Sequence, residues 1–233
     1  MIRSIIRLRP RRILVDVDTQ RDFLLAEGLV CVRNHRRVLA NIRRVTAWAR
    51  YNNIRIISTA QVYPENNGRK EHFCIDGTAG QRKISYTIRN NHISFVADGN
   101  TDLPRDILRS YDQVIFNKRS FDPFAEPRLD RLLSELRVDE VILMGVCTED
   151  AIKATVLGLL HRGKKVTVVS DAVGSRNKSE GNLALRQMQA KGAKLIEAKA
   201  LAGVSGLRVV GVCRCNRCRG LMRKEVVSTS IVN

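Results

Sequence analysis

The chain has 233 residues, of which 44% are hydrophobic and 27% are charged, a composition typical of a folded domain. Lysine and arginine outnumber aspartate and glutamate 41 to 23, so the formal net charge is +18. No apolar run reaches the roughly 18 residues that a membrane-spanning helix needs, and residues 1–12 hold no apolar stretch typical of a secretory signal. We therefore expect a cytoplasmic protein with no membrane partner.

The positive charge attracts phosphates and nucleic acid without sequence preference. The arginines, however, are spread along the chain, and aromatic residues make up only 5% of it. No basic motif interleaved with base-stacking aromatic residues is present. Nucleic-acid binding through the basic surface is an alternative that the sequence does not favour.

Apolar runs of two types alternate along the chain: short unbroken runs predict buried strands, and apolar residues at helical spacing predict helices. In chain order we expect a strand at 13–17, a helix at 38–50, a strand at 54–57, a loop region at 61–99, a strand at 114–116, a helix at 128–136, a strand at 141–146, a helix at 148–161, a strand at 166–169, a helix at 179–191 and a strand at 194–196. This pattern predicts a three-layer α/β/α fold around a central, mainly parallel sheet.

The chain divides into three parts by composition. Residues 1–12 form a basic arm, residues 13–203 form one domain, and residues 204–233 form a basic tail. The tail carries Cys213, Cys215 and Cys218, whose spacing suits zinc, but a closed tetrahedral site needs a fourth ligand and none is close in sequence. We favour a tail without metal, with a zinc site completed by a partner subunit as the alternative.

Polar residues follow three of the predicted strands. Asp18 follows the strand at 13–17, Lys118 follows the strand at 114–116, and the segment 147–151 follows the strand at 141–146. Ligands of such sheets bind beyond the carboxyl ends of the strands, so we expect all three to converge at one edge. Strand alternation turns the side chain of Asp16 the same way as that of Asp18, so Asp16 is expected to be a local charge partner. Asp22 is expected to cap the loop after the first strand, with orientation of that loop as the alternative role.

Four segments carry a resemblance to a known family. They are D-T-Q-R-D-F at 18–23, F-N-K at 116–118, G-V-C-T-E-D-A at 145–151 and S-D-A at 170–172. Together, in this order and each beside a strand, they resemble the isochorismatase-like family, which includes nicotinamidases and related cysteine hydrolases. The resemblance covers residues 13–201.

The resemblance implies a catalytic set of an aspartate, a lysine and a cysteine. The first two correspond to Asp18 and Lys118, but the position of the cysteine nucleophile is occupied by Ala151. Alanine cannot attack a carbonyl, so no acyl-enzyme can form at this position. Cys147 is an alternative nucleophile, although a small buried thiol with a packing role is the favoured interpretation.

The resemblance also implies how a substrate is held. Backbone N–H groups near a cis peptide, in the segment Gly145, Val146 and Cys147, would form an oxyanion hole, and Gln20 and Phe23 would contact substrate. The positions of the metal ligands of nicotinamidases correspond to Gln61, Tyr63 and Phe73, which are poor ligands for such a site, and a lone His72 is expected to be solvated. We therefore expect no cofactor and no metal in the active site.

The sequence supports one leading function and one alternative. The leading function is a metal-independent and thiol-independent hydrolase for a small, anionic substrate, with Asp18 as acid/base and Lys118 as its electrostatic partner. The alternative is a catalytically inactive family member that serves as a ligand-binding or interaction subunit. Because relatives are commonly oligomeric, we expect a homo-oligomer.

Overall fold

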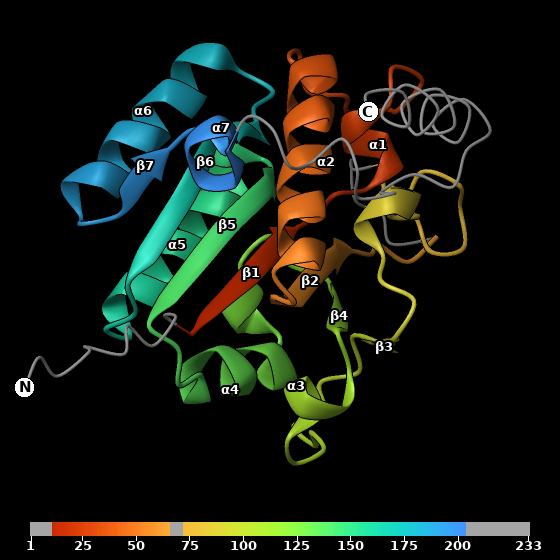
Figure 1. The fold of residues 1–233 in the computed structure, drawn as a ribbon. Helices are drawn as coiled ribbons and strands as arrows, with labels where there is room; N and C mark the ends of the chain where they lie inside the picture. Colours follow the sequence, from red (N-terminus) through yellow and green to blue (C-terminus); the bar gives the residue numbers. More distant parts are fainter. Residues whose placement is uncertain (1–10, 66–71, 204–233) are drawn as a thin grey trace, which may run out of the picture.

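A computed structural model of the chain describes residues 11–65 and 72–203 (Figure 1). Most of the basic arm and the whole cysteine tail, including the zinc site considered for Cys213, Cys215 and Cys218, lie outside the described residues. In the described part, no helix combines the length and the apolar character needed to cross a membrane.

The fold is a seven-stranded sheet between two layers of helices, as the sequence predicts (Figure 1). Its strand order is β3-β4-β2-β1-β5-β6-β7, and every pair of neighbouring strands is parallel. The strands are β1 (Arg12–Val17), β2 (Arg55–Gln61), β3 (His92–Phe95), β4 (Gln113–Lys118), β5 (Glu140–Val146), β6 (Val166–Gly174) and β7 (Lys194–Ile196).

Helices and single turns connect the strands. The α-helices are α1 (Arg21–Leu24), α2 (His35–Tyr51), α3 (Ile107–Ser110), α4 (Pro127–Glu135), α5 (Lys153–His161), α6 (Lys178–Ala190) and α7 (Ala198–Ala202). Two 3₁₀ turns, η1 (Ser85–Thr87) and η2 (Pro123–Ala125), lie in the loops, and a π-helical turn, η3 (Thr148–Ile152), runs directly into α5.

Side-chain alternation along β1 divides the core between the two faces of the sheet. Ile13, Val15 and Val17 pack with residues of α4, α5 and α6, whereas Leu14 packs with residues of α1, α2 and α7. These side chains are almost completely buried, and each contributes roughly 2 kcal/mol by leaving water. The central position of β1 in the sheet therefore fixes its carboxyl end, where Asp18 follows.

The structure differs from the predicted elements in its short helices α1, α3 and α7 and its two 3₁₀ turns, which were not predicted, and also in three further places. The short edge strand β3 lies inside the region predicted as a loop, β6 continues to Gly174 beyond the predicted strand, and the first turn of the predicted helix 148–161 is π-helical. Gly163 ends α5 as expected, with a φ of 68° and backbone hydrogen bonds from Gly163 and Lys164 to the last turn.

Candidate active site

The carboxyl ends of β1, β2 and β4 bring three polar segments to one edge of the sheet. The register pairs Gln61 of β2 with Lys118 of β4, and Asp18 follows β1, which is the other neighbour of β2. Asp18 has a φ of 48°, so its backbone leaves the strand in the left-handed region. The convergence expected from the strand topology is therefore present for Asp18 and Lys118.

Asp18 and Lys118 form a buried ion pair. Lys118 Nζ lies 2.7 Å from Asp18 Oδ2, and the two residues are only 1% and 3% exposed. Lys118 Nζ also donates to Gln61 Oε1 at 2.8 Å and to the carbonyl oxygen of Ser120 at 3.0 Å. An ammonium group has three protons, so these acceptors fix the position of the Lys118 charge completely.

The second oxygen of the Asp18 carboxylate is also held. Thr59 of β2 donates its hydroxyl to Asp18 Oδ1 at 2.5 Å and accepts from the Asp18 backbone N–H at 3.1 Å. Asp18 therefore has a fixed orientation, with a cation on one oxygen and a hydroxyl on the other. Such a preorganised carboxyl group is suited to exchanging a proton with a bound molecule.

The segment after β5 forms the opposite wall of the site. The peptide bond between Val146 and Cys147 is cis, as the resemblance implies, and Gly145 before it has a φ of 129°. The turn η3 begins directly after Cys147, and Thr148 donates its hydroxyl to the carbonyl oxygen of Gly174. Because the first N–H groups of a helix lack partners within the helix, this turn presents donors near the site.

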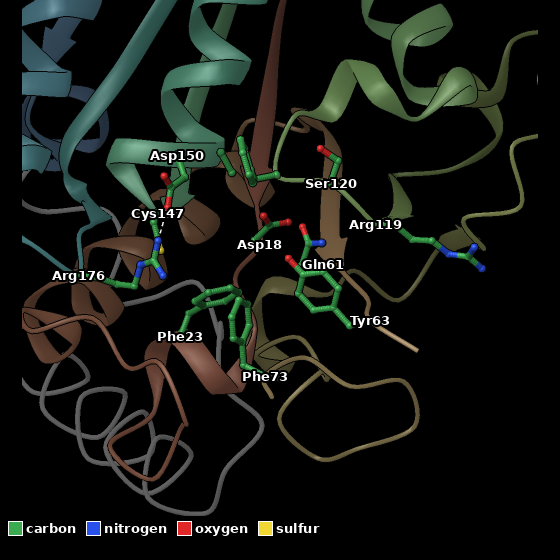
Figure 2. A pocket seen from close by; sticks show the side chains of 12 residues that line it. Asp18, Phe23, Gln61, Tyr63, Phe73, Arg119, Ser120, Cys147, Asp150 and Arg176 are labelled. Atoms are coloured by element: carbon green, nitrogen blue, oxygen red, sulfur yellow. Dashed lines mark hydrogen bonds and ion pairs between the residues drawn. The ribbon is translucent and has the colours of Figure 1, made fainter. Parts of the chain in front are cut away.

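A cavity of about 380 Å³ lies between these walls (Figure 2). Figure 2 shows Asp18 at its centre, with Gln61 and Tyr63 on one side and Cys147 on the other. The lining residues are Asp18, Phe23, Gln61, Tyr63, Phe73, Arg119, Ser120, Phe121, Cys147, Asp150, Ala151 and Arg176. The site thus joins an acid/base group, apolar rings and two arginines around one open space.

Ala151 lies in the wall of this cavity, at the first turns of the helix after β5. Its methyl group contributes no chemistry there. Cys147 is 5% exposed, and burial raises the pKa of its thiol to about 12. At neutral pH the thiol is therefore protonated, which agrees with a packing role for Cys147.

Arg176 is held at the cavity by acidic residues of η3. Its guanidinium forms an ion pair with Asp150, and its backbone N–H donates to Glu149 Oε1 at 2.9 Å (Figure 2). The sequence analysis did not identify this residue. Arg176 follows the carboxyl end of β6, so the rule that ligands bind at this edge was the available signal.

Asp16 belongs to a separate buried ion pair. Its Oδ2 lies 3.0 Å from Lys83 Nζ and accepts from the hydroxyl of Ser58 at 2.9 Å. Asp16 does not line the cavity that contains Asp18. Asp16 is therefore not the charge partner of the Asp18 site that was expected, but pairs with Lys83, a residue of the predicted loop that sequence reasoning missed.

Two residues of the first motif have side chains that hydrogen-bond to the backbone of other segments. Gln20 is completely buried, exchanges hydrogen bonds with the backbone of Gln61, and does not line the cavity, in contrast to the substrate contact expected for it. The capping role expected for Asp22 is wrong, because the side chain makes no cap. Asp22 lies inside α1, and its carboxylate accepts from the backbone N–H groups of Leu29 and Cys74. Phe23, by contrast, lines the cavity as predicted.

The positions that correspond to metal ligands in nicotinamidases lie on the cavity wall without forming a ligand set. Gln61, Tyr63 and Phe73 line the cavity, and His72 is exposed. Within residues 11–65 and 72–203, no group of three or more histidine, cysteine, aspartate or glutamate side chains is placed to hold a metal ion.

Comparison with known proteins agrees with this fold. The isochorismatase domain model matches residues 12–200. The nicotinamidase of Escherichia coli (strain K12) is 27% identical over 203 residues, which are 80% of this chain and 94% of that protein. The structure of a pyrazinamidase from Pyrococcus horikoshii in complex with zinc is similar with a TM-score of 0.63 at 24% identity, over 81% of this chain and 99% of that one.

A ribonuclease is also among the similar structures. The MAR1 ribonuclease from Caenorhabditis elegans is similar with a TM-score of 0.57 at 23% identity, over 97% of both chains. The identity of both solved structures is low, so these likenesses concern the fold. With the domain match covering most of the chain and the motif residues placed at one edge of the sheet, this protein belongs to the isochorismatase family of hydrolases.

Proposed function

We propose that this protein is a metal-independent hydrolase that acts on a small, anionic molecule without a thiol nucleophile, with Asp18 as acid/base and Lys118 as its electrostatic partner. The observation that carries the proposal is the access of Asp18 to the cavity of about 380 Å³. An ion pair kept only for packing needs no such space beside it. The open cavity thus also supports an enzyme or a ligand-binding member over an inactive member that serves only as an interaction subunit.

Cleavage of a vinyl ether is the reaction that fits these groups best. For this reaction the Asp18 carboxylate must first take up a proton, which it would then donate to the vinyl carbon that does not carry the ether oxygen. This leaves a positive charge shared between the oxygen-bearing vinyl carbon and the ether oxygen. Water then adds to that carbon, and the resulting hemiketal separates into a ketone and an alcohol. The proton that water loses returns to the Asp18 carboxylate, so the reaction needs neither a cysteine nor a metal ion.

Charged and polar groups around the cavity support an anionic substrate. Arg119 and Arg176 line it, and Gln61 Nε2, also at the wall, has no hydrogen-bond acceptor in the described part of the chain. The formal net charge of +18 adds a long-range attraction for anions. A carboxylate beside the reacting bond could use these donors, and would orient that bond toward Asp18.

The test is hydrolysis of isochorismate, nicotinamide and simple amides by the wild type, Asp18→Asn, Ala151→Cys and a control, Asp139→Asn. Asp139 is half exposed, interacts with Arg11 and directly precedes β5, so it lies at the end of that strand opposite to the motif at 145–151. We expect vinyl-ether cleavage by the wild type and the control, and a loss of at least about 100-fold in Asp18→Asn. No wild-type turnover, with amidase activity only in Ala151→Cys, would instead support the inactive member.

A second candidate is cleavage of RNA, favoured by the net charge of +18 and by the fold likeness to the MAR1 ribonuclease. Attack of a ribose 2′-hydroxyl on the adjacent phosphate forms a 2′,3′-cyclic phosphate and breaks the bond to the 5′-oxygen, so it needs no protein nucleophile. Ionised Asp18, beside Lys118, could accept the proton of the 2′-hydroxyl, and the leaving 5′-oxygen takes up a proton from the acid so formed or from water. End-labelled single-stranded RNA would be incubated with the wild type and Asp18→Asn at several salt concentrations. Cleavage that persists in Asp18→Asn would assign it to another site or to a contaminant.

A further inference from the structure

A second cavity, of about 520 Å³, adjoins the segment that follows β4. It shares Arg119 and Ser120 with the Asp18 cavity, so these two residues form the wall between the two spaces. Its lining residues are Ala97, Asp98, Gly99, Lys118, Arg119, Ser120, Ala125, Glu126 and Pro127. No step proposed for Asp18 uses this cavity.

Glu126 is a buried acid in the wall of this cavity, and one of its carboxylate oxygens has no hydrogen-bond partner in the described part of the chain. The residue is 6% exposed, and its Oε1 is shielded from solvent without a hydrogen bond. It occupies the N-cap position of α4, yet its side chain caps none of the helix N–H groups. Asp122, only four residues earlier, does cap its turn by accepting from the N–H of Phe124. The carboxylate of Glu126 is thus left for something outside the described chain.

The charges nearby do not compensate Glu126. Burial and the neighbouring Asp98 raise its pKa more than Arg128 and Arg119 lower it. Arg128 is committed elsewhere, since it lies 2.7 Å from Asp98 Oδ1, donates to the carbonyl oxygen of Asp102 and stacks over the ring of Phe95. Lys118 also borders the cavity, but its ammonium is bound to Asp18.

We propose that the cavity beside Glu126 is a second binding subsite, which takes a positively charged nitrogen group of guanidinium type. A desolvated carboxylate is stabilised best by a cation that also donates hydrogen bonds, and a guanidinium presents several N–H donors together with its charge. Arg119 and Ser120 line both cavities, whereas Asp18 lines only the first and Glu126 only the second. The subsite therefore stands independently of any catalytic role of Asp18.

The experiment is a titration of the full chain with methylguanidinium chloride, followed by NMR amide shifts at constant ionic strength. Methylurea, which has nearly the same shape and donors but no charge, is the matched probe. Glu126→Gln removes the charge at the subsite, and Glu135→Gln removes an exposed carboxylate from the other end of the same helix. Binding rather than turnover is measured, so the outcome does not depend on the proposed hydrolase activity.

We expect saturable binding of methylguanidinium by the wild type and by Glu135→Gln, with shifts confined to the segments that line the cavity, residues 97–99, 118–120 and 125–127. Binding should weaken at least roughly ten-fold in Glu126→Gln, and methylurea should bind the wild type at least roughly ten-fold more weakly. Three results would overturn the proposal: no saturable binding by the wild type, equal binding by Glu126→Gln, or equal binding of methylurea. If Glu126→Gln fails to fold, the wild-type shift map and the methylurea comparison still decide.

Discussion

Lys118 Nζ lies 2.7 Å from Asp18 Oδ2, and this contact joins the end of β4 to the residue after β1 across the end of β2. Both residues are almost completely buried, so each charge depends on the other and on a few fixed donors and acceptors. Thr59 and Gln61 of β2, the strand between them, complete the set. The ion pair therefore links two strands of the sheet and is also the candidate catalytic pair.

Breaking this pair from one side should destabilise the fold strongly. Lys118→Met leaves the Asp18 carboxylate without its cation, and Asp18→Leu leaves a buried ammonium, so each should lower the free energy of unfolding by about 3–5 kcal/mol. The double variant should lose much less than the sum. Urea unfolding of the four proteins measures this coupling. Additive losses below about 1 kcal/mol would mean that water screens the pair.

The thiols at positions 147 and 151 should differ sharply in reactivity. Because burial raises the pKa of Cys147 to about 12, about one molecule in ten thousand carries its thiolate near pH 8. We expect slow alkylation of Cys147 by iodoacetamide in the wild type and fast alkylation of the new thiol in Ala151→Cys, where Lys118 is near the cavity. Peptide mapping by mass spectrometry separates these sites from Cys31, which is only half-buried.

A matching measurement tests whether Cys147 takes part in chemistry. Cys147→Ser should keep any hydrolysis that Asp18 supports, because the buried thiol is not ionised in the working range. Loss of turnover in folded Cys147→Ser, with Asp18 intact, would restore Cys147 as the nucleophile.

Gly145 should not tolerate a side chain. It has a φ of 129°, and a Cβ there would lie 1.9 Å from the carbonyl oxygen of Val17 in the neighbouring strand. Gly145→Ala should therefore cost at least about 4 kcal/mol or abolish folding. Gly192→Ala is the control, since Gly192 also has a positive φ, of 106°, but a Cβ there meets no atom within 4 Å. Its cost should stay near about 1 kcal/mol, measured by thermal unfolding.

Strong local patterns explain why most of the sheet could be predicted from the sequence. The strands at the centre are unbroken apolar runs, and β5 is buried at six of its seven positions. β3 was not predicted because it is a four-residue edge strand with alternating exposure, inside a region whose Pro, Gly and Asn residues indicate a loop. The extension of β6 escaped because Ser170 and Asp171 interrupt its apolar run, while the backbone continues to pair with β5 as far as Gly174.

Only those residues of the candidate site that belong to a local sequence motif could be predicted. Asp18 and Lys118 could be found from local motifs after strands, but Thr59 and Arg176 become part of the site through the order of the strands. Asp22 shows the opposite failure. Its place in sequence suggested a helix cap, whereas its carboxylate reaches Cys74, 52 residues later. Long-range partners of this kind leave no local pattern.

The pH dependence of stability should show the uncompensated charge of Glu126. Its pKa is raised in the folded state, chiefly by burial, so the folded protein holds this proton more tightly than the unfolded chain. The contribution of the neutral acid is fully present below the unfolded pKa, near 4.5, and is lost as the pH rises through the folded pKa. The side chain at position 126 cannot ionise in the Glu126→Gln variant, so this position adds no pH dependence to the stability of that variant.

We therefore expect the wild type to lose stability relative to Glu126→Gln as the pH rises from about 4.5 toward neutral pH, by on the order of 1 kcal/mol, the cost of a buried polar group without a partner. Urea unfolding of both proteins across this range measures the difference directly, and other titrating groups cancel in it. Glu135→Gln, whose carboxylate is exposed and paired with Arg131, should show no such trend. A constant difference between the wild type and Glu126→Gln would mean that solvent or an unseen partner already compensates the carboxylate, and the cavity beside it would then have no need of a cation.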